Sequence, residues 1–210
     1  LGSCMVRCLL TLNSQQNLGL RVLAVVRNIA KAEVMFGKQN DVLGFYTYDF
    51  SDNKIFNPTE KIDFIVHFAS PTASKYFVEK PVETMVTVFN GTKNLLDYAR
   101  TNEIQSVLLA SSLEIYGTIT NDSKPLTEDA QGYLNPIDVR SSYPMAKRAA
   151  ETLCHNYAKE YGTHTKVARL AQTFGAGVTK NDNRVFAQFA RSIINGEDII
   201  MHTKGELCRC

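Results

Sequence analysis

Tyr143 and Lys147 lie four residues apart in SSYPMAKRAAE, the stretch at residues 141–151. Residues with this spacing share one face of a helix, so the phenol and the ammonium would lie together. Pro144 is tolerated there only if the helix is just beginning. Such a pair is either an ordinary surface contact or an acid–base device, and the spacing alone does not decide between them.

Further polar or small residues stand where apolar runs end. Five runs rich in β-branched residues are predicted strands, at residues 20–26, 42–50, 62–70, 105–112 and 165–172. Near-continuous hydrophobic stretches such as FIVHF are typical of strands covered on both faces. Because parallel α/β sheets bind ligands outside the carboxyl ends of their strands, we expect the site at residues 27–28, 49–50, 67–72, 111–114 and 172–175.

Three amphipathic segments alternate with these strands and are predicted helices. They span residues 3–13, 82–101 and 143–161. This alternation predicts an α/β fold built on a doubly wound parallel sheet.

The composition narrows the class of protein. The chain has 210 residues, 44% of them hydrophobic, and a formal net charge of +2. It is long enough for one full domain and part of another. The charge gives no case for a nucleic acid partner, and no apolar run approaches a membrane span. Five irregularly spaced cysteines indicate free thiols in a reducing cytoplasm, and Cys208 and Cys210 offer too few ligands for a metal site.

Four segments, in this order, resemble the extended short-chain dehydrogenase/reductases of the NAD-dependent epimerase/dehydratase family, which modifies nucleotide sugars. They are DFIVHFAS, VLLASSLEIYG, SSYPMAKRAAE and VARLAQTFGAGV. The resemblance implies a Rossmann-type NAD(P)-binding domain over residues 1–173 and the beginning of a smaller sugar-nucleotide-binding lobe over residues 174–210. Within the family, these segments and NDNRVFAQF are most similar to UDP-glucuronate decarboxylases.

The two ends depart from the family's pattern. The family opens with a strand and a G-x-x-G-x-x-G turn that binds the pyrophosphate at a helix N-terminus. Gly2 is similar to the third of these glycines. We therefore expect the sequence to be an interior portion of a longer protein, whose sheet would need a further central strand.

The resemblance implies a role for each member of the catalytic set. Tyr143 would be the base that removes a proton from a sugar hydroxyl, with Lys147 lowering its pKa and binding the nicotinamide ribose. Ser112 would hydrogen-bond the reacting hydroxyl. Glu114 would face the sugar ring, although a solvated surface glutamate is equally compatible with the sequence. Leu113 stands where the 4,6-dehydratases carry an acid, which counts against removal of water.

The residues implied to bind the adenosine end of the cofactor are compatible with either NAD or NADP. Arg27 and Asn28 replace the acidic residue that accepts the ribose hydroxyls of NAD, and an arginine there suits the 2′-phosphate of NADP. Family habit favours NAD, which we expect, with NADP as the alternative. The usual asparagine of the following helix is replaced by Val88. The other residues implied to bind the cofactor are Gly2, Asp49, Phe50, Phe68, Ala69, Ser70, Thr87 and Ser111, together with Tyr143 and Lys147.

For the substrate, the resemblance implies that Arg184 and Arg209 bind the diphosphate, since an arginine can clamp phosphate with two parallel bonds. Glu114 and Gln172 complete the implied substrate-binding set. Gln172 and Ala176 replace the family's Asn and Pro, so the pocket need not match a known relative.

The expected function is modification of a nucleotide-linked sugar through transient oxidation at C4 with bound NAD(P). Decarboxylation is the first choice and 4-epimerisation the second. An NADPH-dependent carbonyl reductase and a non-catalytic NAD(P)-binding protein of the same fold remain alternatives. The family implies a cytoplasmic homodimer that pairs helices 82–101 and 143–161. Apolar residues of these helices could equally form the monomer core, namely Met85, Leu95, Leu96, Ala149 and Leu153.

Overall fold

The computed structural model describes residues 1–52, 54–119, 125–175, 177–178 and 180–201. The chain divides into two compact units, Leu1–Arg169 and Leu170–Cys210, which are described separately here. Arg209, Cys208, Cys210 and Ala176 lie outside the described residues. In the described part of the chain, no helix combines the length and apolar character that a membrane crossing requires.

Five strands form at the positions predicted from the apolar runs. They are β1 (Val22–Val26), β2 (Leu43–Thr47), β3 (Phe64–His67), β4 (Ser106–Ser112) and β5 (Thr165–Leu170). β1 pairs with β2, and a second sheet has the order β3-β4-β5. The pairs β1–β2 and β3–β4 are both parallel. Parallel sheets with flanking helices confirm the α/β class, but among the described residues the hydrogen-bonded ladder does not continue from one sheet to the other.

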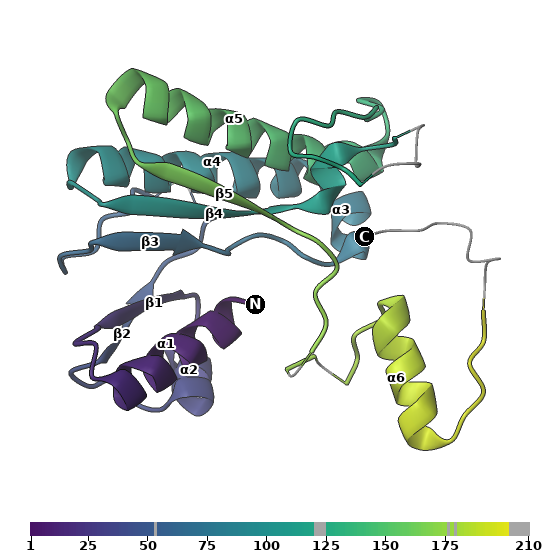
Figure 1. Ribbon diagram of the computed structural model, residues 1–210, viewed down its shortest axis with the longest axis horizontal. Helices are drawn as coiled ribbons and strands as arrows, with labels where there is room; N and C mark the ends of the chain where they lie inside the picture. The colour runs from purple at the N-terminus through teal and green to yellow at the C-terminus, as the bar shows by residue number, and fades with distance from the viewer. Residues whose placement is uncertain (53, 120–124, 176, 179, 202–210) are drawn as a thin grey trace. The chain divides into compact units, whose positions relative to one another are not determined.

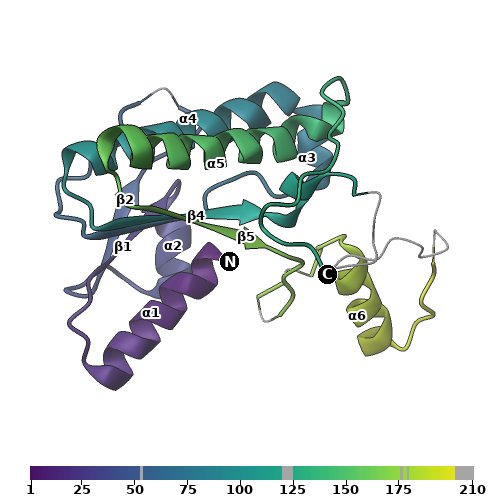
Figure 2. The same cartoon turned by 45° about the horizontal axis from the view of Figure 1, so that its top comes forward.

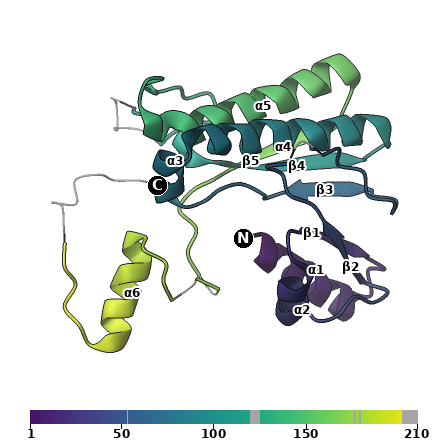
Figure 3. The same ribbon diagram turned by 180° about the vertical axis from the view of Figure 1, so that it is seen from behind.

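Helices cover both sheets. α1 (Gly2–Gln16) and α2 (Ile29–Phe36) lie beside β1 and β2, whereas α4 (Pro81–Thr101) and α5 (Ser142–Tyr161) run side by side over β3–β4–β5 (Figures 1 and 3). The short helix α3 (Ser74–Glu79) precedes α4, and the 3-10 turns η1 (Leu113–Tyr116) and η2 (Val139–Ser141) flank the connection from β4 to α5. The second unit contains α6 (Val185–Asn195). The sequence patterns predicted α1, α4 and α5, but not the shorter helices α2, α3 and α6.

The main core lies between the helix pair and the second sheet. Leu96 of α4, Leu109 of β4 and Ala150 of α5 are almost completely buried in it. The pairing of α4 with α5 is also visible from above in Figure 2. A smaller core joins Ala24 and Phe45 of the first sheet to the flanking helices. Burial of these apolar faces stabilises the strand ends that carry the site.

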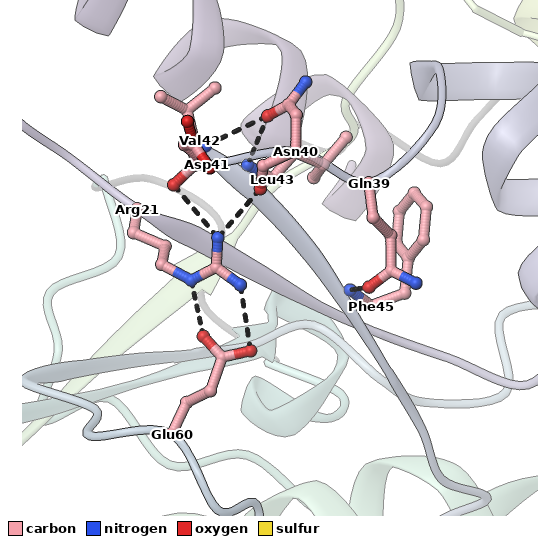
Figure 4. A network of polar contacts seen from close by, with 8 residues as sticks. All are labelled: Arg21, Gln39, Asn40, Asp41, Val42, Leu43, Phe45 and Glu60. Atoms are coloured by element: carbon pink, nitrogen blue, oxygen red, sulfur yellow. Dashed lines mark hydrogen bonds and ion pairs between the residues drawn. The ribbon is translucent and has the colours of Figure 1, made fainter.

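The amino end of the first sheet is held by a polar network (Figure 4). The guanidinium of Arg21 donates two hydrogen bonds to the carboxylate of Glu60, from Nε at 2.5 Å and Nη2 at 3.0 Å, and donates from Nη1 to the carbonyl of Asn40 at 2.9 Å. Gln39 accepts a hydrogen bond from the backbone N–H of Phe45 at 2.9 Å. This network fixes the start of β2 and satisfies an N–H that the β1–β2 ladder leaves free.

Candidate active site

A pocket of about 470 Å³ opens where β1, β2 and β3 end. Its position at the carboxyl ends of parallel strands is where α/β sheets bind ligands. Seven of the residues predicted to bind the cofactor line this pocket: Arg27, Asp49, Phe50, Phe68, Ala69, Ser70 and Thr87. The remaining lining residues are Val25, Tyr48, Ser51, Pro71, Thr72, Ala73 and Tyr76.

Phe50 forms one apolar wall of the pocket and is itself only 9% exposed. A Cβ at Gly91 of α4 would lie 3.1 Å from the Phe50 ring, so the glycine allows the helix to approach the ring closely. Val88, on the same helix, is buried in the main core and not in the pocket lining. The side chain of Val88 therefore cannot make the polar contact with the cofactor ribose that an asparagine would make at this position.

Arg27 and Asp49 face each other across the ends of β1 and β2. The guanidinium Nη1 lies 3.9 Å from the Asp49 carboxylate, and the Arg27 side chain is 79% exposed. Two hydrogen bonds from Ser51 lower the pKa of Asp49, with the charge of Arg27 adding a smaller effect. The side chain of Asn28 caps α2 by accepting the N–H of Lys31 at 2.9 Å, which turns it toward the helix start.

Tyr143 lies in the first turn of α5, with its ring stacked on Phe77 of α3. The two ring centroids are 4.3 Å apart and the planes differ by 4°. The side chains of Ser112, at the end of β4, and Ser70, after β3, lie near enough to the phenol to lower its pKa. Because Ser70 also lines the pocket, the phenol and the pocket are adjacent.

Lys147 lies one turn further along α5 and is 3% exposed. Its ammonium donates to the carbonyl of Ala110 in β4 at 2.8 Å, and lies 5.8 Å from the centroid of the Tyr143 ring. Burial lowers the pKa of Lys147 to about 8, against an opposing effect of Glu151. The shared helical face predicted for Tyr143 and Lys147 is therefore present.

The electrostatics of Tyr143 differ from the sequence-based expectation. Burial raises the pKa of the phenol above its ordinary value, and the nearby charge of Glu114 raises it further. The side chains of Ser112 and Ser70 and the charge of Arg140 lower it. Burial is the largest of these effects, so the net shift of the Tyr143 pKa is upward, and the acidifying role of Lys147 stays a prediction.

Glu114 is held by an arginine that the sequence motifs did not single out. Its carboxylate forms an ion pair with the Nη2 atom of Arg140, at 2.9 Å from Oε1 and 2.8 Å from Oε2. The backbone N–H of Glu114 donates to Ser112, whose side chain thereby caps η1. Glu114 is thus neither free nor fully solvated, and it stays within the charge environment of Tyr143.

His67 ends β3 beneath the same cluster and is fully buried. Burial lowers its pKa to about 3, and the charge of Lys147 adds to this effect. Its ring lies 5.0 Å from that of Phe50. The imidazole is therefore neutral at physiological pH and adds no positive charge beside Tyr143.

Ser111, near the end of β4, does not line the pocket, but its hydroxyl bears on whether a dinucleotide fits at these strand ends. Its hydroxyl is buried at the end of β4 and has no hydrogen-bond partner among the described residues. A buried hydroxyl without a partner costs free energy, so such groups are usually satisfied by a ligand or water. Together with the pocket and the Lys147 ammonium, the donor set suits a ligand with ribose hydroxyls and an amide. The residues present fit NAD.

The structure gives no packing reason for glycine at position 2. Gly2 begins α1, and a Cβ built on it would lie 3.6 Å from Cβ of Phe68, an ordinary van der Waals contact. Its proposed place beside the cofactor therefore stays a prediction from the family pattern.

The predicted substrate residues are divided between the units. Gln172 and Arg184 belong to the second unit, whereas Glu114 belongs to the first. Gln172 is exposed. Arg184 donates from Nε and Nη2 to the carboxylate of Asp182, and its guanidinium lies 4.6 Å from the centroid of the Phe186 ring. A phosphate would have to compete with Asp182 for this arginine.

Sequence reasoning missed Arg140 and Phe77, which contact Glu114 and Tyr143. Arg140 could have been considered from the sequence, because it lies only three residues before Tyr143, next to the motif that contains it. Phe77 carries no comparable signal, because it lies in a short helix 66 residues away in sequence from the ring that it stacks on.

Comparison with known proteins places the chain in a family. The sequence model of the NAD dependent epimerase/dehydratase family matches residues 1–209. The chain belongs to this family. Membership confirms the resemblance carried by the four sequence segments. It also agrees with the parallel sheets and flanking helices of a Rossmann-like fold.

Members of the family that resemble the chain include two UDP-glucuronic acid decarboxylases. UDP-glucuronic acid decarboxylase 1 of Xenopus tropicalis is 33% identical over 168 residues, covering 80% of this chain and 39% of the relative. UDP-glucuronic acid decarboxylase 6 of Arabidopsis thaliana is 34% identical over 149 residues, covering 71% of this chain and 43% of the relative. The chain therefore spans about two fifths of the length of these relatives.

A solved structure supports the fold independently. UDP-glucuronic acid 4-epimerase from Bacillus cereus, in complex with UDP-glucuronic acid and NAD, superposes with a TM-score of 0.75 at 19% identity. The match covers 99% of this chain and 64% of the epimerase. At this identity the similarity shows a common fold.

Proposed function

We propose that the protein containing this chain is a nucleotide-sugar-modifying enzyme that uses bound NAD, and that its reaction is decarboxylation of UDP-glucuronate. The observation that carries the proposal is the cluster of Tyr143, Ser112, Lys147 and Glu114 beside a pocket at the strand ends. The identity of more than 30% with UDP-glucuronic acid decarboxylases favours the decarboxylation.

Different residues of the pocket would contact different parts of a bound dinucleotide. Arg27, Asp49 and Phe50 would contact the adenosine end, and Phe68 to Ser70 would run along the middle. Ser111 and Lys147 would satisfy their polar groups with the nicotinamide nucleoside. When bound there, NAD supplies hydride transfer to and from C4 of the sugar.

In this mechanism Tyr143 would accept the proton of the C4 hydroxyl while C4 is oxidised, and Ser112 would hydrogen-bond the same oxygen. The C4 ketone weakens the bond from C5 to the carboxylate, so carbon dioxide leaves and C5 takes up a proton. Tyr143 would return its proton to the C4 oxygen when the ketone is reduced, which restores the alcohol. Glu114 would orient the sugar ring, and Leu113 offers no acid for removing a hydroxyl.

The test uses the full-length protein purified with whatever nucleotide it retains. We expect denaturation to release a nucleotide that mass spectrometry identifies as NAD. We also expect the protein to convert UDP-glucuronate to carbon dioxide and a UDP-pentose without net consumption of nicotinamide nucleotide. Tyr143→Phe should abolish turnover, by about a hundredfold or more, while the nucleotide stays bound. Tyr161→Phe, at the other end of α5, is the matched control and should keep full activity.

Three outcomes would contradict the proposed decarboxylation. Conversion of UDP-glucuronate or another UDP-sugar to its C4 epimer with retention of all carbon atoms would make the enzyme an epimerase. Stoichiometric consumption of NADPH with a carbonyl substrate would make it a reductase, the alternative that the exposed guanidinium of Arg27 supports. Absence of turnover on every nucleotide sugar, with nucleotide still bound, would indicate a non-catalytic NAD(P)-binding protein.

A further inference from the structure

Arg140 contacts two neighbours of Tyr143 at once. Its Nη2 atom lies 2.8 Å from the carboxylate of Glu114, and its guanidinium carbon lies 4.9 Å from the centroid of the Phe77 ring. Phe77 in turn carries the Tyr143 ring in a parallel stack at 4.3 Å. A cation placed over an aromatic ring and paired with a carboxylate limits the movement of both partners.

The backbone around Arg140 is fixed by its own hydrogen bonds. Asp138 caps η2 by accepting the N–H of Arg140 at 2.9 Å. The hydroxyl of Ser142 donates to the carbonyl of Phe77 at 3.1 Å, which joins the start of α5 to α3. The Phe77 side chain is only 2% exposed. The Asp138 cap and the buried contact between α3 and α5 therefore fix the position of the Arg140 guanidinium.

We propose that Arg140 is a positioning residue: it holds the Glu114 carboxylate and, through Phe77, the ring of Tyr143 in the arrangement that proton transfer requires. The proposal rests on the proposed function, in which Tyr143 is the base. Arg140 is assigned no contact with the substrate. Its effect is exerted through Glu114 and Phe77.

The charges around Tyr143 give the proposal a measurable consequence. The groups facing the phenol are Ser70 after β3, Ser112 and Glu114 at the end of β4 and in η1, Arg140 in η2, and Lys147 on its own helix. Glu114 disfavours the phenolate and Arg140 favours it. While the ion pair is intact, the two effects oppose each other. Removing the arginine leaves an unopposed carboxylate beside the base.

The first experiment measures Tyr143 directly, without requiring turnover. Full-length protein is labelled with 13C at the tyrosine Cζ position, and the Tyr143 resonance is assigned by its loss in Tyr143→Phe. Its titration is followed from neutral pH upward, with circular dichroism confirming the fold at each pH. Arg140→Met should raise the pKa of Tyr143, Glu114→Gln should lower it, and Arg140→Lys should lie close to the unmodified protein.

A double-variant cycle tests whether Arg140 acts through Glu114. In the Glu114→Gln background, Arg140→Met should change the Tyr143 titration less than it does in the unmodified protein, because only the direct effect of the guanidinium charge is lost and no carboxylate is released from its ion pair to move beside the phenol. Arg148→Met is the control for general loosening. Arg148 lies on α5 and donates to the backbone carbonyls of Ile115 and Gly132, so its loss should lower the thermal midpoint without moving the Tyr143 titration.

The second experiment measures turnover. Arg140→Met should lower kcat/KM at neutral pH by about tenfold to a hundredfold, as expected for a misplaced catalytic group. The pH at which kcat/KM rises as Tyr143 loses its proton should also move, in the same direction as the NMR titration. Arg140→Lys should restore part of the loss. An unchanged Tyr143 titration in Arg140→Met, an equal change in the Glu114→Gln background, or an equal change in Arg148→Met would each overturn the proposal.

The two experiments separate this inference from the proposed function. If the NMR titrations behave as expected but no nucleotide sugar is turned over, the positioning contacts stand and the catalytic assignment of Tyr143 fails. If turnover depends on Tyr143 but is insensitive to Arg140, the function stands and the positioning role is wrong.

Discussion

The ammonium of Lys147 on α5 and the carbonyl of Ala110 in β4 are joined by a hydrogen bond of 2.8 Å inside the protein. This contact ties the helix that carries Tyr143 to the strand that carries Ser111 and Ser112. Because Lys147 is buried, the protein stabilises its neutral form relative to water and lowers its pKa from 10.5 to about 8. Folding stability should therefore depend on pH through this one residue.

The first prediction concerns Lys147→Met. Between pH 8 and pH 10.5 the unfolded chain binds a proton at Lys147 that the folded chain has lost, so the stability of the unmodified protein rises with pH across this window. From pH 8 to pH 10 the rise in unfolding free energy should exceed that of Lys147→Met by about 2 kcal/mol. Urea denaturation at the two pH values measures the difference.

The control for Lys147 is Lys166→Met, which removes an exposed lysine of β5. Its pH dependence should match that of the unmodified protein, because this substitution leaves Lys147 in place. If Lys147→Met and Lys166→Met show the same pH dependence, the buried ammonium does not lose its proton in this range and the assignment of its environment is wrong.

The second prediction concerns the selection of the cofactor by Arg27. The end of β1 carries an exposed guanidinium, and the Asn28 oxygen that could accept a ribose hydroxyl is already used to cap α2. A 2′-phosphate would gain a charged partner from Arg27. Arg27→Asp should therefore lower the affinity for NADPH by about tenfold or more and change the affinity for NADH much less.

Titration calorimetry of full-length protein freed of nucleotide measures both affinities. Lys31→Ala, which removes a cation from the first turn of α2 without touching the pocket lining, is the matched control. Equal losses for NADPH and NADH in Arg27→Asp would mean that the arginine does not distinguish the 2′-position.

Several parts of the site could be predicted from sequence because they depend on local spacing. The four-residue step from Tyr143 to Lys147 placed both on α5, and the end of an apolar run placed Asp49 and Phe50 at the pocket. The ion pair of Arg140 with Glu114 could not be predicted in this way, since the two residues are 26 positions apart and meet only when η1 and η2 fold together.

The same reasoning explains which helices were missed. α4 and α5 are long and carry an apolar face, so the spacing of their apolar residues predicts a helix. α3 has six residues, too few to show a helical spacing of apolar residues. Its stability comes from packing. The upward direction of the Tyr143 pKa shift could not be predicted for a related reason, because burial of the ring, which stacks on Phe77, is a tertiary effect that spacing along one helix does not report.

The third prediction concerns the homodimer that the family resemblance implies. Leu95 and Leu96 of α4 are buried in the monomer core, but another set of apolar residues on this helix is exposed: Val82, Met85, Val86 and Phe89. Their spacing of three and four residues places them on one face, the pattern by which helices pair across an interface. We expect this face to meet its copy in a second subunit.

Met85→Glu combined with Phe89→Glu would place two carboxylates in that interface, and their duplication by symmetry would put like charges against each other without partners. We expect the full-length protein to change from dimer to monomer in light scattering after size exclusion, while its circular dichroism stays unchanged. Val34→Glu, at a 91% exposed position of α2, should leave the dimer intact. A dimer that survives the double substitution at micromolar concentration would show that the subunits associate through another surface.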